Sequence, residues 1–230
     1  MKKKCLAMLL ALVMAAGFLT GTAFAASASG PCGNSAAWSY RSGTPANGAI
    51  HYNSVIPAQP NTPVFIDVPS WYAVEANWAA ANGIAKGVGN NQFAPGDICT
   101  NAQILTFLWR AEGKPAAKAA SPFTVASDYQ GAVDWAYEQG MIGRSFVPGA
   151  YCTRANAVSY IWRTFDSESP GAGGGGFTDV SPNAVYADAV AWAVENGITN
   201  GYPGNIFLPN KTCSRGEIVT FLYRAYVQSL

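Results

Sequence analysis

The chain has 230 residues, of which 50% are hydrophobic and 12% are charged, and its formal net charge is +1. This composition is typical of a globular protein and argues against a nucleic-acid binder, which needs a clear excess of cationic side chains. Glycine and proline lie at the edges of apolar segments, which predicts many short elements rather than disorder.

The N-terminus has the pattern of a secretory signal peptide. Three lysines precede an apolar run at residues 6–19, and Ala-Phe-Ala follows at residues 23–25. We therefore expect a signal peptide over residues 1–25, cleaved after Ala25. The alternative is an uncleaved membrane anchor, but the run is short for a bilayer span. No later stretch is long and apolar enough to cross a bilayer, so an exported, soluble mature protein without membrane contact is predicted.

A spacer follows the signal peptide. Residues 26–62 are rich in serine, alanine, glycine, asparagine and proline and have no lasting hydrophobic period, which predicts a flexible linker. The spacer contains His51, the only histidine of the chain. A single histidine in a linker is not expected to be a ligand.

From residue 63 onward the chain repeats itself three times. The segment FIDVPSWYAVEANWAAANGIAKG (65–87) matches FTDVSPNAVYADAVAWAVENGITNG (177–201), and residues 123–143 are a looser middle copy. The period is about 55 residues, which indicates tandem structural repeats. The copies are assigned to residues 63–118, 119–170 and 171–230.

Each copy is predicted to form two helices joined by a loop. The first helix of copy three has an apolar stripe at helical spacing, formed by Ala187, Val190, Ala191 and Val194. The second helix of copy one has the same pattern, formed by Ile104, Leu105, Leu108 and Trp109. The first helices are expected to end at glycines in the left-handed conformation, namely Gly83, Gly140 and Gly197. The loop of copy two is shorter by four residues, so its surface should differ.

The junction between the loop and the second helix recurs in the three copies, with the sequences FAPGDICTNAQ, FVPGAYCTRAN and FLPNKTCSRGE. Thr100, Thr153 and Ser214 are predicted N-caps, with Gln103, Asn156 and Glu217 three residues later. This spacing predicts a capping box, and the loss of such a cap costs about 1 kcal/mol. Asn156 is short for the reciprocal bond, so copy two should have a weaker box.

Four cysteines remain after the predicted cleavage, namely Cys32, Cys99, Cys152 and Cys213. An even number in an exported chain is compatible with two disulfides. Three of them occupy equivalent positions and cannot all pair with one another, which favours buried free thiols. Their spacing fits no zinc motif, so no metal or other cofactor is expected.

The order of these motifs resembles the surface-layer homology (SLH) repeat. Phe-x-Asp-Val, a helix that ends in Gly-Ile, a glycine-rich loop with Phe-x-Pro, and a Thr-Arg-Ala-Glu-like helix start follow one another over residues 63–230. The resemblance implies an all-α fold with a pseudo-threefold arrangement of three helix-loop-helix SLH repeats around a central helical bundle. It also implies a secreted protein of the cell surface that binds secondary cell-wall polysaccharide non-covalently in grooves between repeats. In this family a pyruvate ketal on the terminal sugar is often the bound group.

The Thr-Arg-Ala-Glu motif places Arg154 and Arg215 at two of the three helix starts. A planar guanidinium can hold both oxygens of a sugar carboxylate, and free amides at a helix start favour an anion. The alternative is a solvated surface arginine, and replacing both arginines with alanine is expected to leave thermal unfolding nearly unchanged. Asn101 lacks the charge, so the site that depends on copy one should be weak or absent. The expected groove walls are Lys86, Gly87, Asn200, Gly201 and Tyr202.

Other repeated residues are assigned structural roles. A tryptophan on the first helix of each copy could stack on a sugar but is expected in the core; these are Trp78, Trp135 and Trp192. An arginine late in each second helix is expected to complement a helix C-terminus; these are Arg110, Arg163 and Arg224. Val125 departs from the pattern, because aspartate stands at this place in the other copies, as Asp67 and Asp179.

Three functions are compared with these sequence features. The first is a non-enzymatic anchor that binds cell-wall polysaccharide through several weak grooves. The second is a self-assembling surface-layer protein, or a protein that recruits a partner such as another surface-layer protein through residues 26–62. The third is a glycan hydrolase, which needs a pair of carboxylates across a cleft. It is the least favoured, because pairs such as Asp128 and Asp134 or Asp179 and Asp188 do not recur among the copies.

Overall fold

The computed structural model describes residues 64–165 and 173–228, and every regular element in these ranges is a helix. The all-α class is therefore confirmed. The predicted signal peptide and spacer, together with Cys32 and His51, lie outside the described residues. The six α-helices are α1 (Ala73–Ala81), α2 (Asn101–Ala111), α3 (Ser127–Glu138), α4 (Arg154–Thr164), α5 (Ala187–Glu195) and α6 (Arg215–Tyr223). The short helical turns are η1 (Ser70–Tyr72), η2 (Gly173–Gly176) and η3 (Arg224–Gln228).

The helix boundaries follow the local signals of the sequence. Gly83, Gly140 and Gly197 follow α1, α3 and α5 with φ of 65°, 70° and 68°, as predicted for a left-handed helix end. Thr100 and Ser214 form complete capping boxes at the starts of α2 and α6.

The N-cap of α4 is weaker, as predicted. The Thr153 hydroxyl accepts the amide of Asn156 at 3.2 Å, but no return bond reaches the cap backbone. The Asn156 side chain is too short for that bond, and its Nδ2 donates instead to Oδ1 of Asn101 at 3.3 Å.

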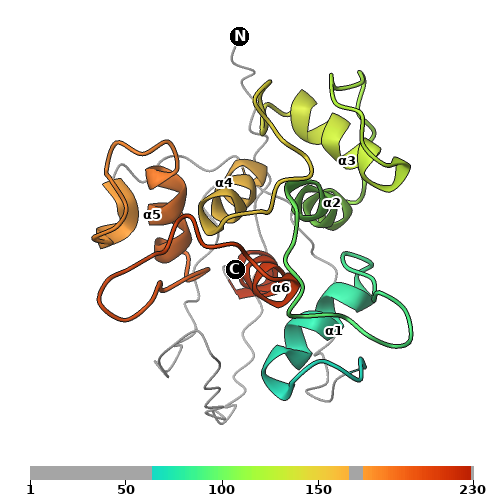
Figure 1. Ribbon diagram of the computed structural model, residues 1–230, viewed down its shortest axis with the longest axis horizontal. Coiled ribbons are helices and arrows are strands. Elements are labelled where there is room, and N and C mark those ends of the chain that lie inside the picture. Colours follow the sequence, from blue (N-terminus) through green and yellow to red (C-terminus); the bar gives the residue numbers. More distant parts are fainter. Residues whose placement is uncertain (1–63, 166–172, 229–230) are drawn as a thin grey trace, which may run out of the picture.

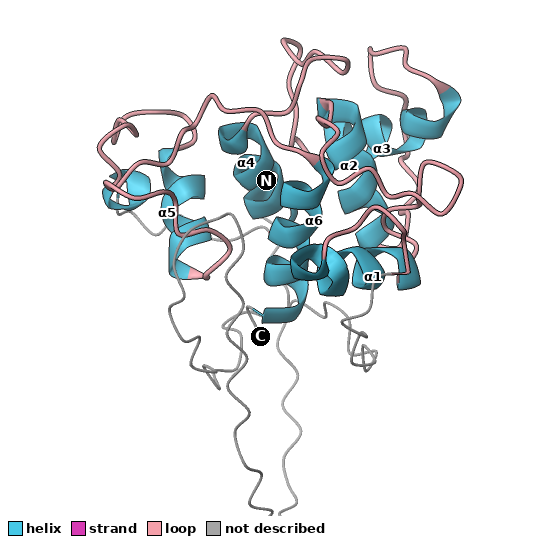
Figure 2. Cartoon of the chain, turned by 60° about the horizontal axis from the view of Figure 1, so that its bottom comes forward, coloured by secondary structure: helices cyan, strands magenta, loops and turns pink. Residues whose placement is uncertain are grey.

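The helices form two groups. Helices α2, α4 and α6 lie in the centre, and α1, α3 and α5 lie outside them (Figure 1). Each outer helix packs against the central helix of another copy: α3 packs against α2, α5 against α4, and α1 against α6. Because α1 packs against α6, the first copy contacts the last. Most connecting loops gather on one side of the helices (Figure 2).

A closed cycle of backbone hydrogen bonds links the three copies. The Cys99 amide donates to the Cys213 carbonyl at 3.0 Å, the Cys152 amide to the Cys99 carbonyl at 2.8 Å, and the Cys213 amide to the Cys152 carbonyl at 2.9 Å. The cysteine position is thus equivalent in the three copies. The exact pseudo-threefold symmetry stays a prediction.

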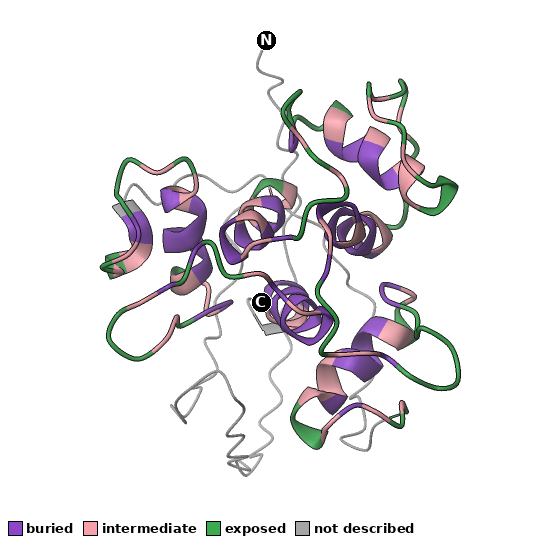
Figure 3. Ribbon diagram, viewed as in Figure 1, coloured by how far each residue is buried: buried purple, intermediate pink, exposed green. Residues whose placement is uncertain are grey.

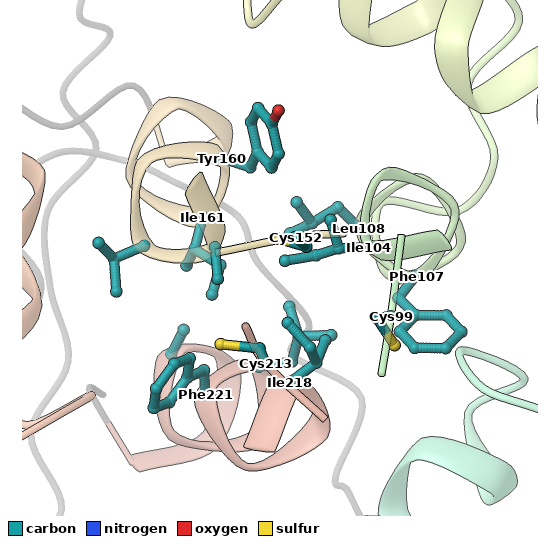
Figure 4. Packing of buried hydrophobic residues seen from close by; sticks show 14 of the residues in the cluster. Cys99, Ile104, Phe107, Leu108, Cys152, Tyr160, Ile161, Cys213, Ile218 and Phe221 are labelled. Carbon is teal, nitrogen blue, oxygen red and sulfur yellow. The ribbon is translucent and has the colours of Figure 1, made fainter. Parts of the chain in front are cut away.

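The hydrophobic core includes buried residues of both the central and the outer helices (Figure 3). Ile104, Leu108, Ile161 and Ile218 are fully buried and point toward one another (Figure 4). Truncating one such side chain to alanine typically costs about 2–5 kcal/mol. The three tryptophans predicted in the core are also buried, namely Trp78, Trp135 and Trp192.

The three cysteines of the cycle are buried free thiols, as predicted. The sulfur atoms of Cys99 and Cys213 lie apart, each on the side of a different central helix (Figure 4). Burial raises the pKa of Cys99 and of Cys213 to about 12. These thiols therefore act as small apolar groups and are poor nucleophiles at neutral pH.

Candidate functional site

Each central helix begins against the loop of another copy, and we name these three contacts after the residue at the helix start. In the Arg154 junction α4 faces residues 199–211. In the Arg215 junction α6 faces residues 84–97, and in the Asn101 junction α2 faces residues 141–150. The same backbone hydrogen bonds occur in all three junctions, at 2.8–3.0 Å.

These bonds occupy the amides at the helix starts. The Arg154 and Ala155 amides donate to the carbonyls of Lys211 and Pro209, and the third amide of the turn, that of Asn156, donates to the cap hydroxyl. The expectation that free helix-start amides favour an anion is therefore wrong. The chain itself supplies the acceptors, because the Phe-x-Pro segment of the next copy crosses the helix start.

Arg154 lies inside its junction, with only 2% of its surface exposed. Its Nε donates to the Phe207 carbonyl at 2.8 Å, and its Nη2 donates to Oγ1 of Thr199 at 3.1 Å. The guanidinium carbon lies 4.9 Å, 4.8 Å and 5.3 Å from the ring centres of Tyr202, Phe207 and Phe221. Such contacts with aromatic faces stabilise a cation. The alternative of a solvated surface arginine is excluded for Arg154.

Arg215 has the same environment and is 8% exposed. Its Nε donates to the Phe93 carbonyl and its Nη2 to the Lys86 carbonyl, both at 2.9 Å. Its guanidinium carbon lies 4.8 Å from the ring centre of Phe93 and 5.3 Å from that of Phe107. Burial lowers the pKa of Arg215, because desolvation disfavours the charged form.

Neither buried arginine forms an ion pair in the described part of the chain. The ion pair recorded there joins Lys211 and Glu217 at 2.7 Å. Asp67 and Asp97 lie near enough to Arg215 to act on its charge, and Glu217 lines the pocket beside Arg154. In both arginines Nε and one N–H of Nη2 are bound to the protein, so Nη1 and the second N–H of Nη2 have no hydrogen-bond partner among the described residues. Burying a cation without an ion pair is costly, so an external anion at this end of the guanidinium would relieve part of that cost.

A pocket opens at the Arg154 junction. Four of the predicted site residues line it, namely Arg154, Asn200, Gly201 and Tyr202. The sequence did not indicate its other lining residues, which are Tyr72, Thr199, Glu217, Thr220, Phe221 and Arg224. The pocket thus combines residues of all three copies, because α1 packs against α6 and brings Tyr72 to the site.

The structure divides the predicted site residues among the three junctions. Lys86 and Gly87 lie in the loop that faces Arg215, and Asn101 lies in neither charged junction. The Asn101 side chain is 5% exposed, and its Nδ2 donates to the Val147 carbonyl at 3.1 Å. It therefore fills the place of the arginine with a neutral bond to the facing loop.

Three departures of the sequence meet at the Asn101 junction. Copy one contributes Asn101 instead of arginine, and copy two contributes the shortened loop and Val125 in place of aspartate. The sequence assigned these changes to different copies. Packing of α3 against α2 brings them into one junction.

Two aspartates hold the loops that the arginines contact. The Asp67 carboxylate accepts the amides of Phe93 and Ala94, both at 2.7 Å. The Asp179 carboxylate accepts the equivalent amides of copy three at 2.8 Å. Burial alone would raise the pKa of Asp67, but the two amides outweigh it and the pKa is lowered. The sequence signal for this role had two parts. The Phe-x-Asp-Val motif recurs in copies one and three, and copy two lacks both the aspartate and the longer loop.

The late arginines bind carbonyls at the ends of the outer helices. Arg110, Arg163 and Arg224 donate through Nη1 to the carbonyls of Ile84, Met141 and Ile198, respectively. Each carbonyl belongs to the residue after the helix-ending glycine of the same copy. The sequence predicted a role at the C-terminus of the central helix that carries each arginine; the hydrogen bonds go instead to carbonyls that follow the outer helix. Arg224 also lines the pocket.

Comparison with known proteins agrees with this geometry. Residues 65–104 and 176–219 match the S-layer homology domain. The chain is 35% identical over 97 residues to the surface-layer 125 kDa protein of Lysinibacillus sphaericus, an alignment that covers 42% of this chain and 8% of that protein. It is 24% identical over 168 residues both to the exoglucanase XynX of Acetivibrio thermocellus and to the amylopullulanase of Thermoanaerobacterium thermosulfurigenes. These alignments cover 65% of this chain and 16% and 9% of the two relatives.

The fold and the junctions define a helical repeat protein whose copies are interlocked by their outer helices. The resemblance to the S-layer homology family is supported by matches of the domain to segments of the first and third copies. Membership of the middle copy stays a prediction, supported by its shared cap and cysteine geometry. S-layer homology domains are non-catalytic modules that anchor surface proteins to the cell wall, which makes this a cell-surface protein. In the part of the chain that the structure describes, no helix has the length and hydropathy needed to cross a bilayer.

Proposed function

We propose that the chain anchors itself to the cell wall by binding an acidic secondary cell-wall polysaccharide at the Arg154 and Arg215 junctions. The observation that carries the proposal is the pair of buried guanidinium groups that form no ion pair among the described residues. Each keeps Nη1 and one N–H of Nη2 as remaining donors. A sugar carboxylate, such as a pyruvate ketal, supplies the missing negative charge.

The charge arrangement determines how the acid would bind. Nε and one N–H of Nη2 are already bound to the protein, so the carboxylate approaches the opposite end of the guanidinium. Nη1 and the second N–H of Nη2 can still hold its two oxygens in a bidentate contact. The protein bonds at Nε and Nη2 and the aromatic rings hold the guanidinium in place before the ligand arrives, which lowers the entropic cost of binding.

Two binding sites follow from the three junctions. The Asn101 junction has no cation at its helix start, its loop is shortened, and it lacks the aspartate that holds the loop. Two weak sites on one rigid frame still give strong attachment to a polymer, because the second contact is intramolecular. We propose no catalytic activity for the chain.

The proposal is tested by sedimentation of the purified mature protein with wall sacculi. Sacculi from which the non-peptidoglycan polymers have been removed are the matched control. Binding to intact sacculi that disappears with the polymer supports the anchor. Equal sedimentation with both preparations, or assembly into a lattice without any wall, overturns it.

The acid requirement is tested separately with pyruvylated and unmodified wall polysaccharide. We expect binding of the pyruvylated form and a large loss with the unmodified form. Arg154→Gln and Arg215→Gln keep a neutral donor for the loop carbonyl and remove the charge, so each should remove one of two sites. Arg144→Ala is the control, because Arg144 is exposed and lies in the shortened loop of copy two. Unchanged stoichiometry in either glutamine variant would contradict the assignment of sites.

A further inference from the structure

Three asparagines in the described part of the chain are followed directly by glycine. The pairs are Asn82-Gly83, Asn196-Gly197 and Asn200-Gly201. Asparagine is chemically labile, and it loses its side-chain amide most readily before glycine, because glycine has no side chain to keep its backbone nitrogen away from the asparagine. The fold decides which of these pairs can react.

Two of the pairs are held by the ends of outer helices. Nδ2 of Asn82 and Nδ2 of Asn196 each donate to the carbonyl of the tryptophan four residues earlier, both at 2.8 Å. The amides of Gly83 and Gly197 donate to helix carbonyls at 3.0 Å. Deamidation joins the glycine nitrogen to the asparagine side chain, and here hydrogen bonds of the helix end engage both groups. We therefore expect these two pairs to be protected in the folded chain.

The third pair lies in the loop after α5 and lacks this protection. Asn200 is exposed, and its side chain makes no hydrogen bond within residues 64–165 and 173–228. The Gly201 amide donates to the Thr199 hydroxyl at 3.3 Å, which is long for such a bond. Glycine cannot be replaced here, because a Cβ atom at Gly201 would overlap the Phe177 ring and lie 2.8 Å from the Ile206 carbonyl oxygen. Packing of the loop thus keeps a labile pair at this position.

The reaction needs no reagent other than water. The Gly201 nitrogen loses its proton to hydroxide and attacks Cγ of Asn200, the bond from Cγ to Nδ2 breaks, and the leaving nitrogen takes a proton from water and departs as ammonia. Water then opens the resulting succinimide ring at either carbonyl and gives aspartate or isoaspartate. In total one water is consumed and one ammonia is released, without oxidation or reduction. The product carboxyl is ionised at neutral pH, so the loop gains a negative charge.

This charge would appear in the Arg154 pocket. Asn200 lines the pocket, and the preceding residue, Thr199, accepts a hydrogen bond from Nη2 of Arg154 at 3.1 Å. Glu217 also lines the pocket, but Lys211 pairs with its carboxylate at 2.7 Å. A carboxylate at residue 200 would compete with an acidic ligand for the guanidinium and repel that ligand.

The Arg215 junction cannot undergo this change. Lys86 precedes Gly87 at the place where Asn200 precedes Gly201. The lysine side chain has no carbonyl carbon for a backbone nitrogen to attack. The two charged junctions therefore differ in chemical stability.

We propose that Asn200 is a site of spontaneous deamidation, and that its conversion weakens ligand binding at the Arg154 junction while the Arg215 junction keeps its affinity. The effect on binding rests on the proposed function, whereas the modification itself does not. A chain that ages at the cell surface thus loses one of its two wall contacts.

Peptide mapping by mass spectrometry tests the modification. The purified full chain is kept in mildly alkaline buffer, which favours loss of the glycine amide proton, and samples are digested over time. Asn200 should convert to aspartate and isoaspartate while Asn82 and Asn196 keep their amides. In urea the three sites should convert at similar rates, because the fold no longer distinguishes them. If Asn200 in the folded chain converts no faster than Asn82 and Asn196, the proposal is overturned.

Titration with pyruvylated wall polysaccharide tests the effect on binding. Ion exchange separates the deamidated chain by its added charge, and peptide mapping selects the fraction modified at Asn200. This fraction should bind about tenfold more weakly at one of two sites, as expected for one like charge close to the ligand at a protein surface. Asn200→Asp should show the same loss before any ageing. Asn183→Asp is the matched control, because it adds the same charge at an exposed residue outside the pocket lining, and its binding should equal that of the wild type.

A second control isolates Asn200 from other asparagines. Asn47-Gly48 lies outside the described residues and is also an asparagine-glycine pair. The Asn200→Gln chain keeps that pair, and glutamine reacts much more slowly because its ring closure is less favourable. Aged Asn200→Gln should bind like its own fresh preparation. An equal loss on ageing in this variant would assign the effect to another residue and refute the role of Asn200.

The outcomes separate this inference from the proposed function. If the fraction modified at Asn200 binds the polysaccharide at two sites with unchanged affinity, the link to the Arg154 junction is refuted and the anchor function stands. If the fresh wild-type chain does not bind the polysaccharide, the anchor function fails together with the effect on binding. Peptide mapping still decides the modification in that case, because it does not depend on a ligand.

Discussion

Replacing Arg154 with alanine should destabilise the protein, contrary to the expectation from sequence that thermal unfolding would hardly change. The side chain is 2% exposed and makes two hydrogen bonds, of 2.8 Å to a carbonyl and 3.1 Å to a hydroxyl. Alanine would leave the Phe207 carbonyl without a donor in a largely buried place. It would also open a cavity between the three rings that pack around the guanidinium.

The magnitude follows from these contacts. Hydrogen bonds from a charged donor contribute about 1.5–3 kcal/mol each, and a buried polar group left without its partner typically costs about 1–3 kcal/mol. Part of that loss is offset because the buried charge itself disappears. We expect a decrease of about 3 kcal/mol in the free energy of unfolding, which corresponds to roughly 6–12 °C in melting temperature for a domain of this size.

The assay is thermal and urea unfolding followed by circular dichroism. Arg154→Ala, Arg154→Gln and the exposed-site variant Arg144→Ala are compared with the wild-type chain. Glutamine keeps a donor and most of the volume, so its melting temperature should fall less than that of alanine, and Arg144→Ala should match the wild type. If the melting temperature of Arg154→Ala falls by less than about 2 °C, the arginine does not hold the junction together and the reasoning is refuted.

Three further predictions concern the packing of the helices and loops. Trp78→Ala should lower the free energy of unfolding by about 3–5 kcal/mol, because Trp78 is 2% exposed and packs edge-to-face on Tyr223 of α6. A loss below about 1 kcal/mol in urea unfolding would mean that α1 does not stabilise α6. In a Cys32→Ser chain, Cys99 and Cys213 should resist a thiol reagent at pH 8 until the chain unfolds, and rapid labelling of the native protein would contradict their burial. Stability should fall as the pH rises from 9.0 toward about 12, because only the unfolded chain releases these protons there. Asp67→Asn should lower the melting temperature at pH 7. The difference in melting temperature from the wild type should shrink below pH 3.8, as the wild-type carboxylate loses its charge. A difference that does not change with pH would exclude the carboxylate charge as its cause.

Local features of the protein could be predicted from the sequence. The caps at Thr100 and Ser214, the incomplete box at Thr153 and the helix-ending glycines depend on residues within a few positions of one another. The repeat added a second kind of information, because three cysteines in equivalent places cannot all pair. That equivalence favoured buried free thiols over disulfides, and the structure has the three as buried free thiols.

The site itself was decided by packing between distant segments. The sequence placed Arg154 and Arg215 at helix starts, but it could not indicate that the loop of another copy would cover those starts and occupy their amides. Nor could it indicate that α1 packs against α6, which brings Tyr72 to the Arg154 pocket. Spacing along a chain determines helices and caps because those bonds are local. Burial of a charge and the walls of a pocket depend on contacts between residues separated by tens of positions, which only the folded chain brings together.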